Sequence, residues 1–365
     1  MRALVLYVLV AAVLLIPTTI CAATWNYVYG GVDSPTKAGN DWTTSGNGTA
    51  TWNLDVAGGG GGGGGGAKAI KLPWDDATPA KYKVYNKSLE ANHTVFAYQL
   101  RFALVGGKGT AEVKPVFWRA RWHDGRTRGI VRSDIGTGKD WADPDNPVPT
   151  APTAFVPEPL AAWDANYHTY TVVMVDDAES NAGCYAYWDG QFAHYRQAAL
   201  GSDVNDTNFG YIQAPPTGYL DAEFWLDYVA WGYEDTSDIS SWGDPEVAGG
   251  LSTGVAATVL TDATANWTPG AFAGQRLAVG TPGMPTTGTN KFNEYVILTN
   301  DATTISIASG DMITDGVLIN DTYRICRTTL GGLPTLDPDA AVPEPCSVLA
   351  LGLGLLGVAG RLRRR

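Results

Sequence analysis

The sequence is short of charged residues, histidine and cysteine, and each shortage narrows what the protein can be. Only 17% of the 365 residues are charged, four are histidines and four are cysteines. No histidine has the His-Glu-x-x-His spacing of a zinc hydrolase. Acidic residues outnumber basic ones by 37 to 25, and the net charge of −12 disfavours nucleic acid as a partner.

Glycine and aromatic residues are abundant instead. The 44 glycines, 13 tryptophans and 17 tyrosines are typical of strands and turns rather than of helical bundles. A chain of this length predicts about two domains.

The N-terminus has the layout of a secretory signal peptide. Arg2 precedes an apolar run over residues 3–16, and small residues follow up to Ala23. We therefore expect cleavage between Ala23 and Thr24, which removes residues 1–23. A retained anchor is the alternative, although the apolar run is short for a membrane span. Lipidation at Cys21 is disfavoured because the bulky Ile20 precedes it.

The C-terminus combines a short motif, an apolar stretch and a basic cluster. Pro343, Glu344 and Pro345 precede the apolar residues 346–360, and four of the last five residues are arginines. This order resembles the PEP-CTERM sorting tail of Gram-negative bacteria. The resemblance implies that residues 342–365 are recognised and processed at the Pro-Glu-Pro motif by exosortase, a membrane protease.

The physical properties of the tail agree with a temporary anchor in the inner membrane. Fifteen helical residues rise about 22 Å, and a basic end stays on the cytoplasmic side. The alternative is a tail anchor that is never cut. The preceding part of the chain would then be exported, and we expect it to reach the cell surface or the extracellular matrix.

Tryptophan marks the domain organisation. Twelve of the 13 tryptophans precede residue 243, and none follows Trp267. A glycine-rich stretch at 243–250 is typical of a linker. We expect a first domain at 24–246, a small all-β module at 250–330, and a flexible linker at 331–341 before the tail.

The first domain contains many short alternating segments with turn signals between them and no convincing amphipathic helix. This pattern predicts an antiparallel β-sandwich or jelly roll. The predicted strands are 113–123 and 126–132 around Asp124-Gly125, 168–175, 185–188 and 191–196 around Asp189-Gly190, and 224–231.

Four segments of the first domain resemble the concanavalin A-like, laminin-G-like jelly rolls of bacterial surface proteins. They are Trp25–Tyr29, His168–Thr171, the hairpin Tyr187–Gly190 and Leu226–Trp231. Members of that family bind or cleave polysaccharides or present surfaces, and many hold a structural calcium ion. The oxygen-rich residues 203–208 are the calcium candidate here, with a simple Asx-rich turn as the alternative.

The second unit alternates β-branched with small or polar residues, which predicts a small all-β module acting as a spacer. The segments are 255–260, 261–268, 272–277, 295–300, 303–307 and 321–325.

Paired carboxylates suited to glycoside cleavage are not evident in the sequence. The Glu-x-Asp-x-x-Glu string of laminarinase-type glucanases is missing. Glu223 and Asp227 share a strand face, but four residues of strand separate them by about 13 Å, more than the roughly 5–9.5 Å that such catalysis uses. We therefore predict that the protein is not an enzyme. A hydrolase or lyase with an acid pair from two different strands is the alternative.

Arginine and aromatic side chains are better candidates for binding a glycan. Arg119, Arg121 and His123 share one strand face, and Trp188 lies beside an Asp-Gly turn; such groups orient hydroxyls and stack on sugars. A core position is the alternative for Trp188. Cys184 and Cys326 are expected to be unpaired or buried thiols.

These observations predict an exported, non-enzymatic surface or matrix protein that associates with extracellular polysaccharide. A matrix filler that binds nothing specific is a further alternative.

Overall fold

The described part of the chain is built entirely from antiparallel β-strands. The computed structural model describes residues 25–46, 48–55, 68–73, 83–91, 93–105, 116–122, 129–136, 166–175, 183–197, 199–200, 205–210, 223–234, 245–280 and 292–329. The strands form three sheets, which confirms the all-β class. No helix in these ranges could cross a membrane. The predicted signal peptide, its cleavage position and the C-terminal tail lie outside them.

The strands follow the chain in this order. They are β1 (Tyr27–Tyr29), β2 (Thr43–Ser45), β3 (Thr51–Asp55), β4 (Lys68–Pro73), β5 (Val84–Ser88), β6 (Val95–Val105), β7 (Val116–Trp122), β8 (Gly129–Gly136), β9 (His168–Val175), β10 (Gly183–Trp188), β11 (Gln191–Gln197), β12 (Ala199–Leu200), β13 (Asp206–Gly210), β14 (Glu223–Glu234), β15 (Glu246–Leu251), β16 (Gly254–Val255), β17 (Val259–Thr261), β18 (Arg276–Gly280), β19 (Asn293–Asn300), β20 (Thr304–Ile307) and β21 (Thr322–Cys326).

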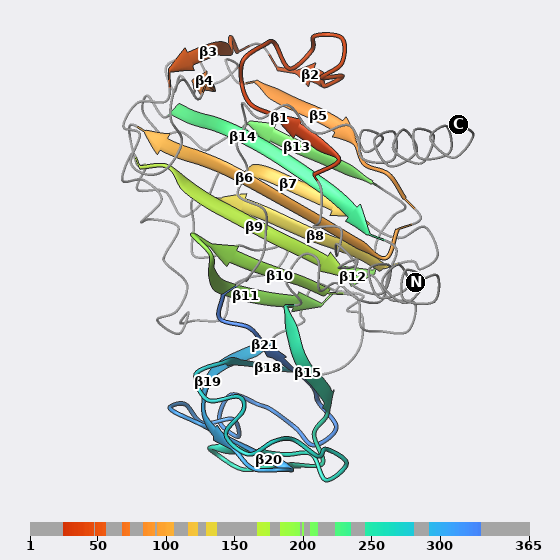
Figure 1. Ribbon diagram of the computed structural model, residues 1–365, viewed down its shortest axis with the longest axis vertical. Coiled ribbons are helices and arrows are strands. Elements are labelled where there is room, and N and C mark those ends of the chain that lie inside the picture. Colours follow the sequence, from red (N-terminus) through yellow and green to blue (C-terminus); the bar gives the residue numbers. More distant parts are fainter. Residues whose placement is uncertain are drawn as a thin grey trace, which may run out of the picture.

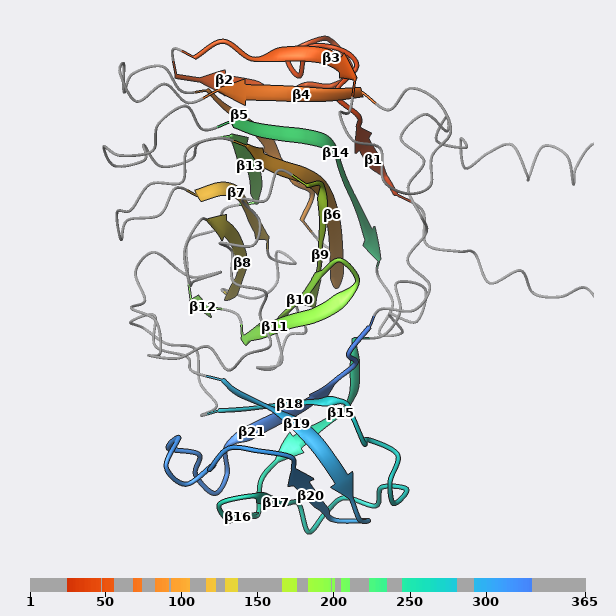
Figure 2. The same ribbon diagram turned by 90° about the vertical axis from the view of Figure 1, so that its left-hand side faces the viewer.

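The first two sheets pack face to face as a β-sandwich (Figures 1 and 2). We call them the front sheet and the back sheet. The front sheet has the order β11-β10-β9-β6-β14-β4-β3, with β1 added beside β14, and the back sheet has the order β12-β8-β7-β13-β5-β2. The predicted β7–β8 and β10–β11 hairpins are both present and antiparallel.

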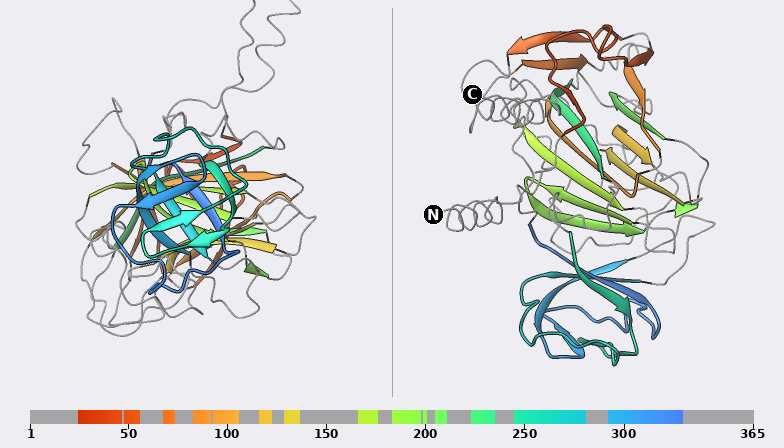
Figure 3. Two further views of the ribbon diagram at one scale, coloured as in Figure 1. Left: turned by 90° about the horizontal axis from the view of Figure 1, so that it is seen from below. Right: turned by 45° about the vertical axis from the view of Figure 1, so that its right-hand side comes forward.

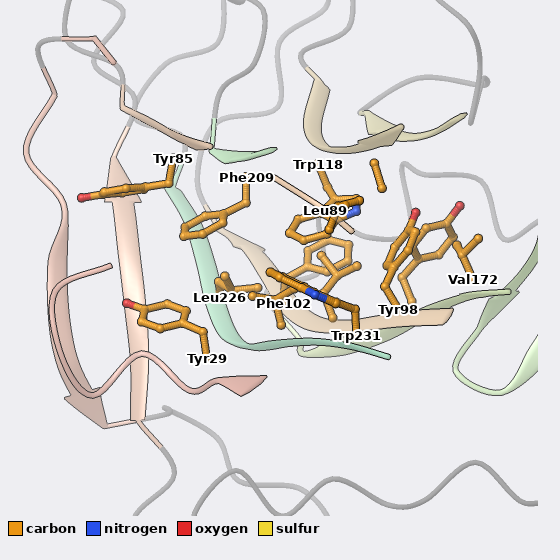
Figure 4. Close-up of a cluster of buried hydrophobic side chains, with 14 of the residues drawn as sticks. Tyr29, Tyr85, Leu89, Tyr98, Phe102, Trp118, Val172, Phe209, Leu226 and Trp231 are labelled. Carbon is orange, nitrogen blue, oxygen red and sulfur yellow. The ribbon is translucent and has the colours of Figure 1, made fainter. Parts of the chain in front are cut away.

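Aromatic side chains from both inner faces fill the sandwich (Figure 4). Tyr98 and Phe102 of the front sheet and Trp118 and Phe209 of the back sheet are fully buried, because alternate residues of each strand point to the core. Each such side chain contributes about 1.5–3 kcal/mol through the area it removes from water. Cys184 belongs to this core.

The third sheet, β15-β21-β18-β19-β20-β17-β16, is the second unit. Residues 246–251 are strand β15 rather than part of a linker. The glycines there let neighbouring side chains pack against the backbone, instead of making the chain flexible. A Cβ on Gly249 would meet Glu246 Oε1 at 2.6 Å, and one on Gly250 would meet the Tyr323 hydroxyl at 2.8 Å. The domain boundary itself stays a prediction.

Another expected strand of the second unit, residues 261–268, is strand only at its first residue. Asp262 accepts hydrogen bonds from the backbone and hydroxyl groups of Thr264, at 2.9 and 2.6 Å, and folds the chain into a turn. The local side-chain acceptor outcompetes the strand ladder, as is common for Asp and Asn.

The second unit docks on the outer face of β10 and β11 (Figure 3). Tyr185 and Tyr195 pack there with Cys326 and Ala278 of the third sheet. The Tyr185 hydroxyl donates to Glu246 Oε2 at 2.6 Å, and the same carboxylate accepts from Arg324 Nη1 at 2.8 Å. Burial, and then the neighbouring Glu246 carboxylate, raise the pKa of Tyr185, so the phenol stays protonated and donates.

The chain after β21 makes a second set of contacts between the two units. Gln191 of β11 forms an antiparallel bridge with Thr329, and the Phe192 N–H donates to the Thr328 carbonyl at 2.6 Å. These bonds occupy part of the β11 edge, which would otherwise expose unpaired backbone groups.

Both cysteines of the described residues are buried, as expected, and they form no disulfide with each other. Cys184 points into the sandwich core, whereas Cys326 lies at the contact between the two units. Burial raises the pKa of the Cys326 thiol well above its usual value.

We expect the Glu246→Ala substitution to lower the free energy of unfolding by about 3 kcal/mol, because it removes the carboxylate that accepts hydrogen bonds from the buried Arg324 guanidinium and the Tyr185 hydroxyl. Denaturant unfolding of the full-length protein in mild detergent measures the change. The substitution should also make Cys326 react with iodoacetamide, as read by peptide mass spectrometry.

The matched control is Glu90→Ala, since the Glu90 side chain is 73% exposed. It should change stability by less than about 0.5 kcal/mol. Equal effects of the two substitutions, with Cys326 still protected, would show that the docking contact does not depend on Glu246.

Candidate functional site

The outer face of the back sheet carries rows of polar residues across β5, β13 and β7. Register aligns Asn86 with Asn208 and Arg119 in one row, and Ser88 with Asp206 and Arg121 in the next. Ala120, between the two rows, and the flanking row of Tyr85, Phe209 and Trp118 belong to the sandwich core. Because side chains alternate along a strand, the polar rows fall on the face turned away from the front sheet. We call this surface the polar face.

An ion pair fixes one row of the polar face. Arg121 Nε lies 2.7 Å from Asp206 Oδ1, and Arg121 Nη2 lies 2.5 Å from Asp206 Oδ2. This two-pronged arrangement holds the guanidinium plane in one orientation. The two side chains are 30% and 24% exposed, so the pair is shielded from water but still reachable from solution.

A pair of amides fixes the neighbouring row. Asn208 Nδ2 donates to Asn86 Oδ1, and the Asn86 carbonyl accepts from Thr43 of β2 at 3.1 Å. Asn208 is almost fully buried, whereas Asn86 is partly exposed. Within the described part of the chain, no hydrogen bond uses Asn208 Oδ1 or Asn86 Nδ2. The pair therefore presents one acceptor and one donor in fixed positions.

The residues proposed from sequence for ligand binding do not all come together. Arg121 lies on the polar face, and register places Arg119 two residues away on the same strand. His123 lies outside the described residues. Trp188 belongs to β10 of the front sheet and is 5% exposed in the sandwich core, where it packs against Phe102.

Trp188 also stacks on His168, with ring centroids 4.8 Å apart. His168 Nδ1 lies 2.7 Å from Asp189 Oδ2, and the Thr169 N–H donates to Asp189 Oδ1 at 2.8 Å. Asp189 and Gly190 have φ values of +47° and +77°, as the two-residue hairpin between β10 and β11 requires. These contacts stabilise the β10–β11 hairpin.

The two acids of β14 lie in separate ion pairs. Glu223 Oε1 is 3.1 Å from Lys71 Nζ, and Asp227 pairs with Arg101. Asp227 lies in a β-bulge, its side chain is 2% exposed, and the Arg101 guanidinium sits 4.8 Å from the Tyr167 ring. Each carboxylate is thus held by a cation of its own.

The calcium candidate is only partly described, since Asp203 lies outside the described ranges. Asp206 binds Arg121 and Asn208 binds Asn86. Across the ranges given above, no three His, Cys, Asp or Glu side chains gather as a metal site would need.

Sequence reasoning found Arg121 through strand alternation, but it missed the partners of Arg121 and of the amide row. Asp206 is 85 residues from Arg121, and Asn86 is 122 residues from Asn208. The alternation of Asp206 and Asn208 around Thr207 was the available signal. The oxygen-rich side chains of 203–208 predict a calcium loop, whereas the structure has strand β13 over Asp206–Gly210.

Comparison with known proteins identifies the C-terminal tail. Residues 341–365 match the PEP-CTERM protein-sorting motif. The chain is therefore that of an exported protein sorted through the membrane, and the motif implies processing by exosortase. No curated protein matches the sequence.

The solved structures similar to this one include a carbohydrate esterase and two lyases. A carbohydrate esterase from the Shiga toxin-encoding bacteriophage phi24B has 14% identity and a TM-score of 0.37, covering 58% of this chain and 99% of its own. An endo-β-1,4-glucuronan lyase from the fungus Trichoderma reesei has 12% identity and a TM-score of 0.37, covering 57% and 96%. At these scores the likeness carries no argument about ligand or reaction.

Proposed function

We propose that the protein is a non-enzymatic component of the cell surface or extracellular matrix that binds polysaccharide through the polar face. The observation that carries the proposal is the pair of fixed polar rows, Arg121–Asp206 and Asn86–Asn208, on the outer side of the back sheet. Fixed amide and guanidinium groups recognise sugar hydroxyls and carboxylates with little loss of side-chain entropy.

The rest of the sandwich supports this choice of face. The outer side of the front sheet is covered in two places, by Trp25 packed over Val95, Ala97 and Ala230, and by the second unit over β10 and β11. The polar face has partly exposed charged and amide groups within one continuous part of a sheet.

The arrangement of the acids favours binding over cleavage. Glu223, Asp227 and Asp206 each form an ion pair with a separate basic side chain, whereas glycoside hydrolysis requires two carboxyl groups that flank one bond. Sorting by the tail supports a destination outside the inner membrane.

We expect the full-length protein in mild detergent to be retarded in native gels that contain alginate, pectin or mixed-linkage β-glucan. The Arg121→Ala substitution should weaken binding about tenfold, because hydrogen bonds made by a charged group contribute about 1.5–3 kcal/mol. Arg327→Ala, an exposed arginine of the second unit, is the matched control and should bind normally.

Equal retardation of the two variants would show that the polar face is not the binding site. Migration unaffected by any of the three polysaccharides would favour a matrix filler. Release of reducing sugar, abolished by one Asp or Glu substitution, would favour the hydrolase or lyase.

Processing of the tail has its own test. We expect Glu344→Ala to leave a full-length, membrane-bound form in a host with exosortase, because the substitution removes the only charge of the Pro-Glu-Pro motif. Asp339→Ala, which removes an acid from the preceding linker, should be processed normally. Normal release and mass of the Glu344 variant, measured by mass spectrometry, would refute processing at this motif.

A further inference from the structure

The outer side of the front sheet changes from apolar to polar along strand β6. Val95 and Ala97 pack there with Trp25, whereas the next two residues on the same side are Gln99 and Arg101. The residues that alternate with them point into the sandwich core. Strand β6 lies between β14 and β9 in this sheet (Figure 1). The polar half of the outer side is therefore formed by β6 and the strands beside it.

The Arg101 guanidinium is held between a carboxylate and an aromatic ring. Its Nη1 donates to Asp227 Oδ2, and its Cζ lies 4.8 Å from the centroid of the Tyr167 ring. The Asp227 side chain is 2% exposed, whereas that of Arg101 is 22% exposed. Within the residues that the structure describes, no hydrogen bond uses Arg101 Nε or Nη2. Arg101 therefore presents further donors in a fixed orientation.

Trp225 lies on the same outer side, on the other strand beside β6. It pairs in register with Ala103 of β6, and its two neighbours in sequence point into the core. Tyr167 reaches Ala103 from the β9 side, because the next residue, His168, pairs with Phe102. Two strand spacings, about 10 Å, therefore separate the backbones of Trp225 and Tyr167. No large side chain of β6 stands between the two aromatic residues, since Ala103 has only a methyl group.

An ion pair also holds the Trp225 indole in place. Its Nε1 donates to Glu223 Oε2 at 2.8 Å, and Lys71 Nζ lies 3.1 Å from Glu223 Oε1 and 5.4 Å from the Trp225 ring centroid. The Lys71 and Glu223 side chains are each 29% exposed. The two aromatic residues of this surface are therefore alike, since each is fixed beside an ion pair and remains partly exposed.

We propose that Trp225, Tyr167 and Arg101 bind a neutral polysaccharide chain on the outer side of the front sheet. Aromatic rings contact the apolar faces of sugars, and the fixed guanidinium donates hydrogen bonds to sugar hydroxyls. Each of the two cations of this surface forms an ion pair with a carboxylate, so the surface fits a neutral chain rather than an anion. The inference does not depend on the polar face, because it uses other residues on the other sheet.

Two variants of the full-length protein in mild detergent test the proposal, Trp225→Leu and Tyr167→Ala. Each is compared with the original protein in native gels that contain mixed-linkage β-glucan, which is neutral, or alginate, which is acidic. We expect each substitution to weaken binding to β-glucan about tenfold, because one of two aromatic contacts is lost, and to leave binding to alginate unchanged.

The matched control is Tyr228→Phe, which removes a hydroxyl on the same side of the sheet. That hydroxyl donates to Gln99 Oε1 at 2.8 Å, and Tyr228 is only 6% exposed. We expect this substitution to lower the melting temperature, because it removes a buried hydrogen bond, and to leave binding to both polymers unchanged.

The outcomes separate this site from the polar face. Unchanged binding of both variants to β-glucan overturns the site on the front sheet, and the polar face still stands if Arg121→Ala weakens binding. Weaker binding of both variants to alginate as well would overturn the preference for a neutral chain. Normal binding of Arg121→Ala, with loss in both front-sheet variants, would support this site and show that the polar face is not one.

A further variant keeps the test valid if Trp225→Leu or Tyr167→Ala unfolds the chain, as measured by circular dichroism. Arg101→Lys retains a positive charge beside the buried Asp227 but loses the planar set of guanidinium donors. We expect it to stay folded and to bind β-glucan less tightly than the original protein. Unchanged binding of the folded Arg101→Lys variant to β-glucan would contradict the role of Arg101.

Discussion

The front sheet has apolar side chains on both faces, and much of the structure follows from the need to cover the outer one. Inner residues such as Phe96 and Val172 belong to the sandwich core, while Val95, Ala97 and Val173 on the outer side pack against Trp25. Further along, Tyr185 and Tyr195 would also face water. A sheet with two apolar faces needs a cover on both sides, and the second unit supplies part of the outer cover.

This constraint gives the second unit a role that its sequence did not suggest. Its strands β18 and β21 bring Ala278 and Cys326 against the two tyrosines. Arg324 and Glu246 form hydrogen bonds there, which offset the cost of burying polar groups away from water. A unit that acted only as a spacer, as expected from the sequence, would not need such contacts. The bridge between Gln191 and Thr329 adds a further contact between the second unit and β11.

Sequence patterns predicted the strands and the two hairpins well, but not the pairing of strands that lie far apart in the sequence. The alternation around Trp118 and Trp122, and the Asp189-Gly190 turn, identified β7, β10 and β11 because these signals are local. The docking of β15 was not predicted, because glycines that permit close approach look like glycines that permit flexibility. For the site, Arg121 could be read from its strand, but Asp206 and Asn86 meet the β7 row only through long-range register.

The central claim is that the polar face contacts polysaccharide. An NMR titration of the isotope-labelled protein with alginate, pectin or β-glucan oligosaccharides tests it directly, through the side-chain signals of Asn86 Nδ2, Asn208 Nδ2 and Arg121 Nε. The account predicts that these three signals shift together and saturate at one oligosaccharide concentration. Signals that stay in place while others, such as those of the second unit, move with the titration would contradict it.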